Sequence, residues 1–336
     1  MSSGHIKDVV LSCNQSINQM QLVAELLLLS SDLRPVRSEA LTGFHDSFPN
    51  CKELVMTRTR GLFVIAGRLH ELLYCISTAR WFDVNRCVHE MCELVISLTE
   101  TCAHAAYLLA LTYPNCYPAE PGIVDLYTAK RTAIDIGICA QHLKQASREQ
   151  LTPPILVQIC STVNKNLGQL TETCKTASSR AVLMQDQEQF KMCVKSSTTS
   201  GGCFLTSIKR FKQQPTEQHR TRCVSFCDSL AAVVSASVNY ASEDQFIGHP
   251  ARISSEAFQS KMAVLGACMS IVSSCIQLCK VVKELAYNIS NQAQMDRIAM
   301  CIQAISRASS QLADAFLQHQ HQAAGDDNAI ANGYNS

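Results

Sequence analysis

The chain has 336 residues, of which 47% are apolar and 17% charged, and its formal net charge at pH 7 is +1. This balance excludes a strongly basic or acidic chain and allows a substantial core to be buried. Aromatic residues make up only 6%, with 13 Gly and 9 Pro. That scarcity disfavours a β-sandwich or barrel and favours an all-α fold of helices packed on helices.

Helical periodicity recurs along the chain, with short breaks between segments. Expected helices cover residues 5–33, 50–80, 84–113, 121–147, 152–178, 186–213, 216–242, 255–288 and 291–321. The second is expected to begin at Asn50, with Glu53 completing its N-terminal cap. The fifth begins at Thr152, with Pro153 at the first helical position. The sixth has a softer middle at "SSTTSGG". Because the loops are short, neighbouring helices are expected to run antiparallel.

The third and fifth segments carry apolar stripes at spacings of three and four residues, and in the third these spacings alternate without a break. The third has Val84, Val88, Met91, Val95, Leu98, Cys102, Ala105 and Leu109. The fifth has Leu156, Ile159, Val163, Leu167, Leu170, Cys174 and Ala177. We expect these stripes to face the core.

The first segment contains "MQLVAELLLLSS" at 20–31, which by composition alone fits a membrane segment, a buried strand or a bundle helix. No apolar run approaches the roughly 18–20 residues needed to span a bilayer, so no membrane insertion is expected. On a helical wheel the polar side chains form one narrow strip, which comprises Asn14, Asn18, Gln21, Glu25 and Asp32. Such a strip indicates contact with neighbours on several sides. We therefore predict the most enclosed helix of a five-helix bundle.

Two breaks suggest domain boundaries: Pro114, Pro118 and Pro121 lie close together, and "FIGHPAR" contains Gly248 and Pro250. The predicted organisation is a five-helix bundle built from 1–120 and 250–322, a four-helix bundle inserted at 121–249, and a disordered tail at 323–336. Charge agrees with this division, because 121–249 contains 14 basic and 10 acidic residues, whereas the remainder contains 15 and 18. The inserted bundle is therefore the basic one.

The 18 cysteines could suggest a disulfide scaffold. That framework belongs to short secreted chains, and residues 1–19 lack the apolar stretch and cleavage site of a signal peptide. No C-x-x-C pair occurs, and cysteines such as Cys268, Cys275 and Cys279 recur at helical spacing. We expect small core residues in a reducing compartment, and hence a cytoplasmic protein.

Several stretches resemble the talin rod family: "KDVVLSCNQSINQMQLVAELLLLSSDLRPV", "VISLTETCAHAAYLLAL", "PAEPGIVDLYTAKR" and "EQFKMCVKSSTTSGGCFLTSIKR". The resemblance extends from about residue 7 to 320. It implies a nine-helix tandem in which a four-helix bundle is inserted into a five-helix bundle. It further implies a non-enzymatic, cofactor-free protein that binds and bundles F-actin and forms a homodimer through the four-helix module. Such a protein would act in actin-rich protrusions such as filopodia.

Signatures of catalysis or metal binding are weak. "HEMCE" at 89–93 resembles a zinc-protease helix, but Glu93 stands where a second histidine is needed, so His89 and Glu93 are interpreted as a solvated i, i+4 pair. His104 and Glu100 are interpreted in the same way. Gly201 and Gly202 lie inside a helical pattern, so they do not form a phosphate-binding loop. We expect no catalytic, metal or cofactor site.

A basic cluster between 191 and 222 is the sharper signal, with seven cations against Glu217. Its members are Lys191, Lys195, Lys209, Arg210, Lys212, Arg220 and Arg222. They are candidates for binding acidic F-actin; the alternatives are an ordinary solvated face or, more weakly, nucleic acid, for which no recognition motif is present. Lys165 and Lys175 are candidates to extend this face. A separate candidate patch on the second helix comprises Arg58, Arg60 and Arg68.

Phe226 is the candidate dimer contact, because bundling requires two filament sites and an aromatic anchor suits the centre of an interface. It belongs to a module whose core is otherwise expected to use small residues, and the alternative is a core phenylalanine. A second class of function also fits: an adhesion-linked scaffold whose bundles bind amphipathic helices of adhesion proteins.

Overall fold

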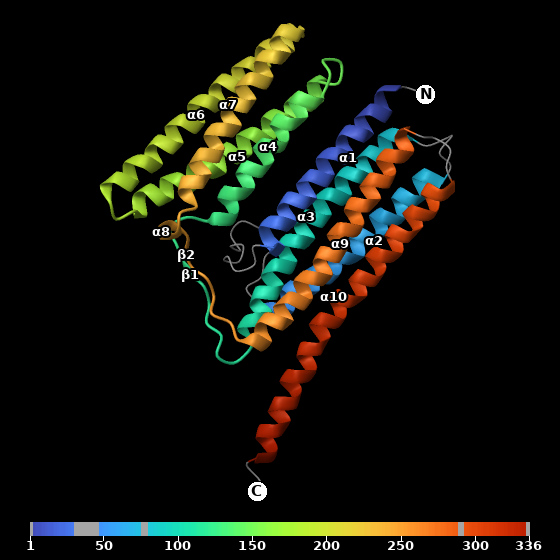
Figure 1. Ribbon diagram of the computed structural model, residues 1–336, viewed down its shortest axis with the longest axis vertical. Helices are drawn as coiled ribbons and strands as arrows, with labels where there is room; N and C mark the ends of the chain where they lie inside the picture. The colour runs from blue at the N-terminus through green and yellow to red at the C-terminus, as the bar shows by residue number, and fades with distance from the viewer. Residues whose placement is uncertain (1–2, 30–46, 75–79, 288–291, 334–336) are drawn as a thin grey trace. The chain divides into compact units, whose positions relative to one another are not determined.

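The computed structural model describes residues 3–29, 47–74, 80–287 and 292–333, with side chains for 6–28, 47–74, 80–287 and 293–317 (Figure 1). The described chain is all-α apart from two two-residue strands. It divides into two units, the first formed by 1–26 and 119–250 and the second by 27–118 and 251–336.

The first unit contains a closed ring of four helices. Helix α4 contacts α5 and α7, and α6 contacts the same two helices, whereas α1 packs against α4. The elements of the unit are α1 (Ser3–Ala24), β1 (Glu120–Pro121), α4 (Leu126–Gln145), α5 (Pro153–Arg180), α6 (Met184–Gln213), α7 (Glu217–Ala241), α8 (Asp244–Ile247) and β2 (Gly248–His249).

Local sequence explains where these helices begin. The Asp125 side chain accepts a hydrogen bond from the Thr128 N–H at 3.2 Å, and Thr216 accepts one from the His219 N–H at 3.2 Å. Both are N-caps, which satisfy donors that the first turn of a helix leaves without partners. Helix α5 begins at Pro153, whose fixed φ and missing N–H suit the first turn.

Phenylalanine contributes strongly to the core of this unit, which corrects the expectation of small residues alone. Phe190, Phe204, Phe211 and Phe246 are all buried. Phe190 lies 5.0 Å from the Phe246 ring centroid and 5.0 Å from that of Tyr240. The aromatic content is an average over the whole chain, so it did not indicate that several aromatic residues gather in the core of this unit.

The second unit contains another closed ring of four helices, in which α3 contacts α2 and α9, and α10 contacts the same two. They are α2 (Phe48–Tyr74), α3 (Trp81–Leu111), α9 (Ser255–Tyr287) and α10 (Gln292–Gly333). The apolar stripe predicted for the third segment is buried at every position, as is the stripe predicted for α5 in the first unit. The periodicity of these two helices therefore predicted their core faces correctly.

The first helix differs from its prediction. Its contacts place it with residues 119–250, not with the unit that contains α2 and α3. Asn18 donates to Gln141 at 3.0 Å and Gln19 donates to Asp135 at 3.2 Å, both on α4. The leucine run forms a π-helix, η1 (Glu25–Leu29). The narrow polar strip predicted several enclosing neighbours for this helix, whereas its main contact is with α4. Amphipathicity does not specify which helix covers an apolar face.

Other boundaries also differ from expectation. Helix α2 begins at Phe48, so Asn50 lies within its first turn and does not precede the helix. Helix α6 continues through "SSTTSGG", where buried Gly201 allows close packing on the side chain of Leu167. Helix α10 extends to Gly333, through most of the segment 323–336 that we predicted as a disordered tail. The alanines of that segment favour a helix, whereas its glycines favour a break.

Two helices of the described chain, α7 and α9, are long and apolar enough by composition to cross a membrane, although no such run was expected from the sequence. Helix α7 has mean hydropathy 1.2 and α9 has 1.9 over their most apolar 18 residues. Both contribute core faces to their rings: half of the α9 window and a third of the α7 window are buried. The burial agrees with a core position for α9, whereas two thirds of the α7 window lies outside the core.

Strands β1 and β2 hold together the two ends of the 119–250 segment. They pair antiparallel, with Glu120 opposite His249 and Pro121 opposite Gly248. Gly248 has φ +79°, in the region that favours glycine, and a side chain there would overlap the backbone of Glu120 and Gly122. Glycine is therefore required at 248 for the two strands to approach.

We predict that Gly248→Ala lowers the melting temperature by about 3–6 °C, because alanine combines an unfavourable φ with backbone overlap. The matched control is Gly168→Ala on α5, where an added Cβ meets no atom within 4 Å. That control should leave the melting temperature unchanged or slightly raised, since glycine weakens a helix interior. Calorimetry of the full chain measures both, and equal melting temperatures for the two variants would contradict the prediction.

Candidate functional site

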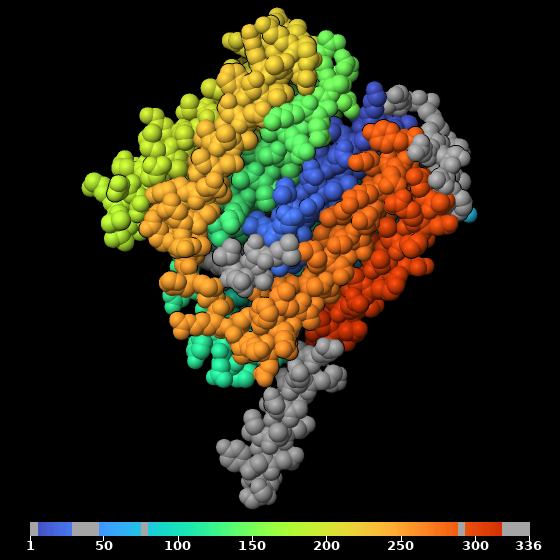
Figure 2. All heavy atoms as spheres, in the orientation of Figure 1, coloured from blue at the N-terminus to red at the C-terminus, as the bar shows by residue number. Residues whose placement is uncertain are grey.

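The seven predicted cations all lie on the hairpin formed by α6 and α7, part of which is visible in Figure 2. Helix α6 carries Lys191, Lys195, Lys209, Arg210 and Lys212, and the first turns of α7 carry Arg220 and Arg222. Arg210 and Lys212 belong to the last turn of α6, where cations interact favourably with the helix dipole.

Three of these residues form a line along the exposed face of α6. At 100° per residue, Lys191, Lys195 and Lys209 fall within about 40° of one another, and at 1.5 Å per residue they span about 27 Å. All three are exposed. We call them the α6 cationic strip. The buried face of α6, which includes Phe190, Phe204 and Phe211, fixes the strip toward solvent.

Two of the seven cations have partners that reduce their availability. Lys191 pairs with Glu188 at 2.7 Å, one helical turn away. Arg220 pairs with Glu217 at 2.6 Å, and its side chain is only 22% exposed. Arg220 also donates to the carbonyl oxygens of Leu143 and Ala146, at 3.3 and 3.2 Å. It therefore satisfies the C-terminal carbonyls of α4, which is a structural role that the sequence did not indicate.

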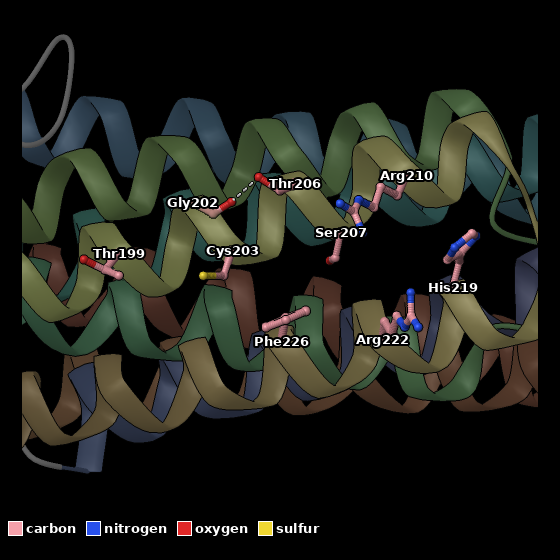
Figure 3. Close-up of a pocket in the computed structure, with 9 residues that line it drawn as sticks. All are labelled: Thr199, Gly202, Cys203, Thr206, Ser207, Arg210, His219, Arg222 and Phe226. Carbon is pink, nitrogen blue, oxygen red and sulfur yellow. Dashed lines mark hydrogen bonds between the residues drawn. The ribbon is translucent and has the colours of Figure 1, made fainter.

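A groove of about 490 Å³ runs between α6 and α7 (Figure 3). Arg210, Arg222 and His219 are grouped toward one end, whereas Phe226 and Cys203 face the groove farther along it. The lining residues are Thr199, Gly202, Cys203, Thr206, Ser207, Arg210, His219, Arg222 and Phe226. The groove thus combines a cationic end with an apolar section.

Phe226 is 42% exposed, so the alternative of a core phenylalanine is wrong. It shares the α6/α7 groove with Arg210 and Arg222. From the sequence, the candidate filament-binding residues and the candidate dimer contact were separate features. The structure brings members of both sets to one surface.

The candidate patch on α2 is engaged in packing against α3. Arg58 is half-buried and donates to the Ser97 carbonyl oxygen at 2.9 Å and to the Thr101 hydroxyl. Burial lowers the pKa of Arg58, although the nearby Glu100 opposes this. Arg68 donates to the Cys87 sulfur at 3.0 Å and pairs with Glu90. Of the three, Arg58 and Arg68 are intermediate in exposure and Arg60 is exposed.

The histidines were placed partly correctly. His89 Nε2 lies 3.4 Å from Glu93 Oε1, as predicted for a solvated i, i+4 pair. His104 and Glu100 are instead buried, so their interpretation as a solvated pair is wrong. Within the described ranges, no group of three or more His, Cys, Asp or Glu side chains could hold a metal ion.

Most described cysteines are buried, as the helical spacing predicted. Burial raises the pKa of the Cys139, Cys174 and Cys227 thiols to about 12, so these thiols stay protonated near neutral pH. Cys203 is exposed and lines the groove. Together with Gly202 and His219, it is a groove residue that sequence reasoning missed. Cys203 lies two helical turns before Arg210, so helical spacing could have placed both on one face of α6. His219 is on α7, and its place in the groove depends on how α7 aligns with α6.

Comparison with known proteins finds similarity to talins. Talin-2 of Homo sapiens is 26% identical over 242 residues, covering 72% of this chain and 9% of that protein. Talin-1 of Gallus gallus is 23% identical over 287 residues, with coverages of 85% and 11%. Talin of Oscarella pearsei is 24% identical over 304 residues, with coverages of 90% and 11%.

The chain therefore spans about a tenth of the length of the curated relatives it matches. No protein-family model matches it. The similarity is weak but extends over most of this chain, and the helices of the described residues agree with a rod-like helical protein.

We predict that Arg220→Ala destabilises the first unit by about 1–2 kcal/mol, since it removes an ion pair and leaves two α4 carbonyls without their donor. Arg222→Ala is the matched control, because Arg222 is an exposed groove cation two residues away, and it should change stability by less than about 0.5 kcal/mol. Urea unfolding of the two variants gives the comparison. Equal midpoints would show that Arg220 does not stabilise the unit.

Proposed function

We propose that the protein binds and bundles F-actin as a homodimer, and that it acts in the cytoplasm in actin-rich protrusions such as filopodia. The observation that carries the proposal is the α6 cationic strip, which lies on the same helical hairpin as the half-exposed Phe226. Similarity to talins supports a cytoskeletal and adhesion-related setting.

The α6 cationic strip suits a long acidic partner. Lys195 and Lys209 are exposed, and their shared face lies along the straight length of α6. F-actin is an acidic polymer, so a row of positive charge would speed its encounter with the protein and hold the complex. Exposed Arg210, Lys212 and Arg222 would add to this attraction at one end of the hairpin.

Bundling requires each particle to contact two filaments. A two-fold dimer doubles a single cationic face, and the avidity of two linked sites exceeds that of either alone. Phe226 is a suitable centre for such a contact because a partly exposed phenyl ring gains much apolar burial when a second copy covers it.

The α6/α7 groove also favours a second candidate function, an adhesion-linked scaffold. Its cationic end would attract the acidic face of a partner's amphipathic helix, although Phe226 alone offers that helix a large apolar anchor. Actin pelleting discriminates between the candidates, because a scaffold of this kind needs no direct contact with the filament.

We predict that Lys195→Glu combined with Lys209→Glu weakens F-actin binding at least about tenfold, because it reverses the middle and end of the α6 cationic strip. High-speed co-sedimentation measures this. The matched control is Lys280→Glu with Arg307→Glu, which reverses two exposed cations on α9 and α10 and should leave pelleting unchanged. Failure of the unmutated chain to pellet with filaments would reject the proposal and favour the scaffold.

We predict that Phe226→Asp gives a folded monomer that still pellets with actin at high speed but no longer at low speed, where only bundles sediment. The matched control is Phe258→Asp on α9, because Phe258 is 44% exposed and thus as accessible as Phe226. Light scattering reports the mass of each variant. A Phe226→Asp chain that remains dimeric would rule out this contact.

A further inference from the structure

The α6/α7 groove has the chemistry of a binding site for an anionic amphiphile. Its cationic end carries Arg210 and Arg222, and its apolar section carries Phe226 and Cys203 (Figure 3). None of its described lining residues is acidic. Without acidic groups in the lining, the two guanidinium groups favour a ligand that brings its own negative charge.

The other polar groups of the lining are largely committed to the protein itself. The Thr206 hydroxyl donates to the Gly202 carbonyl at 2.8 Å, and the Ser207 hydroxyl donates to the Phe204 carbonyl at 2.6 Å. His219 Nδ1 lies 2.8 Å from the Gln214 carbonyl oxygen, so its Nε2 is the nitrogen available to a ligand. Neutral His219 that donates from Nδ1 has only an acceptor at Nε2, so recognition of an anionic group in the groove rests on Arg210 and Arg222.

We propose that this groove binds a phospholipid that carries a phosphate monoester, such as phosphatidic acid. The phosphate, with a charge of about −1.5 to −2 at pH 7, would lie against Arg210 and Arg222. A guanidinium group can donate two parallel hydrogen bonds to two oxygens of one phosphate. The acyl chains would cover Phe226 and Cys203. The volume of about 490 Å³ is that of a pocket for a small ligand.

The lining favours a lipid over a helical peptide. A docked helix needs apolar anchors repeated over two or more turns of its length. Here the large apolar lining is confined to Phe226, and Thr199 and Ser207 lie on either side of it along the groove. A short apolar chain attached to a doubly charged head matches this arrangement more closely.

Lipid and a second copy of the chain would compete for Phe226. One phenyl ring cannot pack fully against both, so bound lipid is expected to raise the monomer fraction. This competition rests on the proposed dimer. Because the coupling is reciprocal, dimer formation would weaken the apparent lipid affinity. The lipid-binding measurement is therefore made without actin, and light scattering of the same sample reports whether a second copy competes for Phe226.

Gly202 offers a variant that fills the groove without disturbing the fold. It lies on the exposed face of α6, and an added Cβ there meets no atom within 4 Å. Gly202→Leu therefore places an isobutyl group in the space that the acyl chains would occupy. Gly168→Leu on α5 is the matched control, since Gly168 is also helical, exposed and open at Cβ.

The experiment is isothermal titration calorimetry of the full chain with dihexanoyl phosphatidic acid below its micelle concentration. The comparison ligands are dihexanoyl phosphatidylcholine, which has the same chains, and glycerol 3-phosphate, which has the head alone. We expect phosphatidic acid to bind at least about tenfold more tightly than either. Gly202→Leu and Arg222→Gln should each weaken it at least about tenfold, whereas Gly168→Leu should bind like the unmutated chain.

Each opposing result overturns the proposal. Equal affinity for phosphatidic acid and phosphatidylcholine would show that the arginines do not select the ligand. Glycerol 3-phosphate binding as tightly as the lipid would reveal a site for free phosphate. Undiminished binding by Gly202→Leu, or no binding by the unmutated chain, would exclude the groove as a lipid site. Actin co-sedimentation of the same preparation reports on the proposed function separately.

Discussion

The packing of α6 against α7 is the contact on which the candidate surface depends. Each helix buries one face in its four-helix ring, α6 through Phe190, Phe204 and Phe211 and α7 through Cys223 and Leu230. Once those faces are buried, the 3.6-residue period determines which side chains of each helix face solvent. The α6 cationic strip, the α6/α7 groove and the exposure of Phe226 all follow from this one contact.

The sequence predicted buried faces well and partners poorly. The stripes of α3 and α5 were read correctly at every position, because spacing alone determines which side of a helix is apolar. The neighbours of α1 were wrong, since the same spacing contains no information about which helix covers that side. The same limit applies to the site. The cations of α6 and α7 were found from the sequence, but the groove between them was not, because it depends on how the two helices of the hairpin align.

Charge shows a further limit of sequence reasoning. Seven cations in one run suggested a single uniform surface, yet Arg220 is held by the α4 carbonyls whereas Arg222, two residues away, is exposed in the groove. On a helix, the side chains of residues i and i+2 point in directions about 200° apart around the axis. Residues close together in sequence can therefore lie in different surroundings. Arg58 and Arg68 on α2 repeat the pattern, because both are engaged with α3. A count of positive residues therefore overstates the charge that is available to a partner.

The pairing of β1 with β2 bears on how such a chain arises. Because Glu120 lies opposite His249, the segment between them begins and ends within one pair of backbone neighbours. A module with adjoining ends can be spliced into a surface loop of a host without stretching the host's own chain. Because its two ends are adjacent, removal of the module would require only a tight turn to reconnect the host chain. Gly248 is the residue whose backbone permits that close approach.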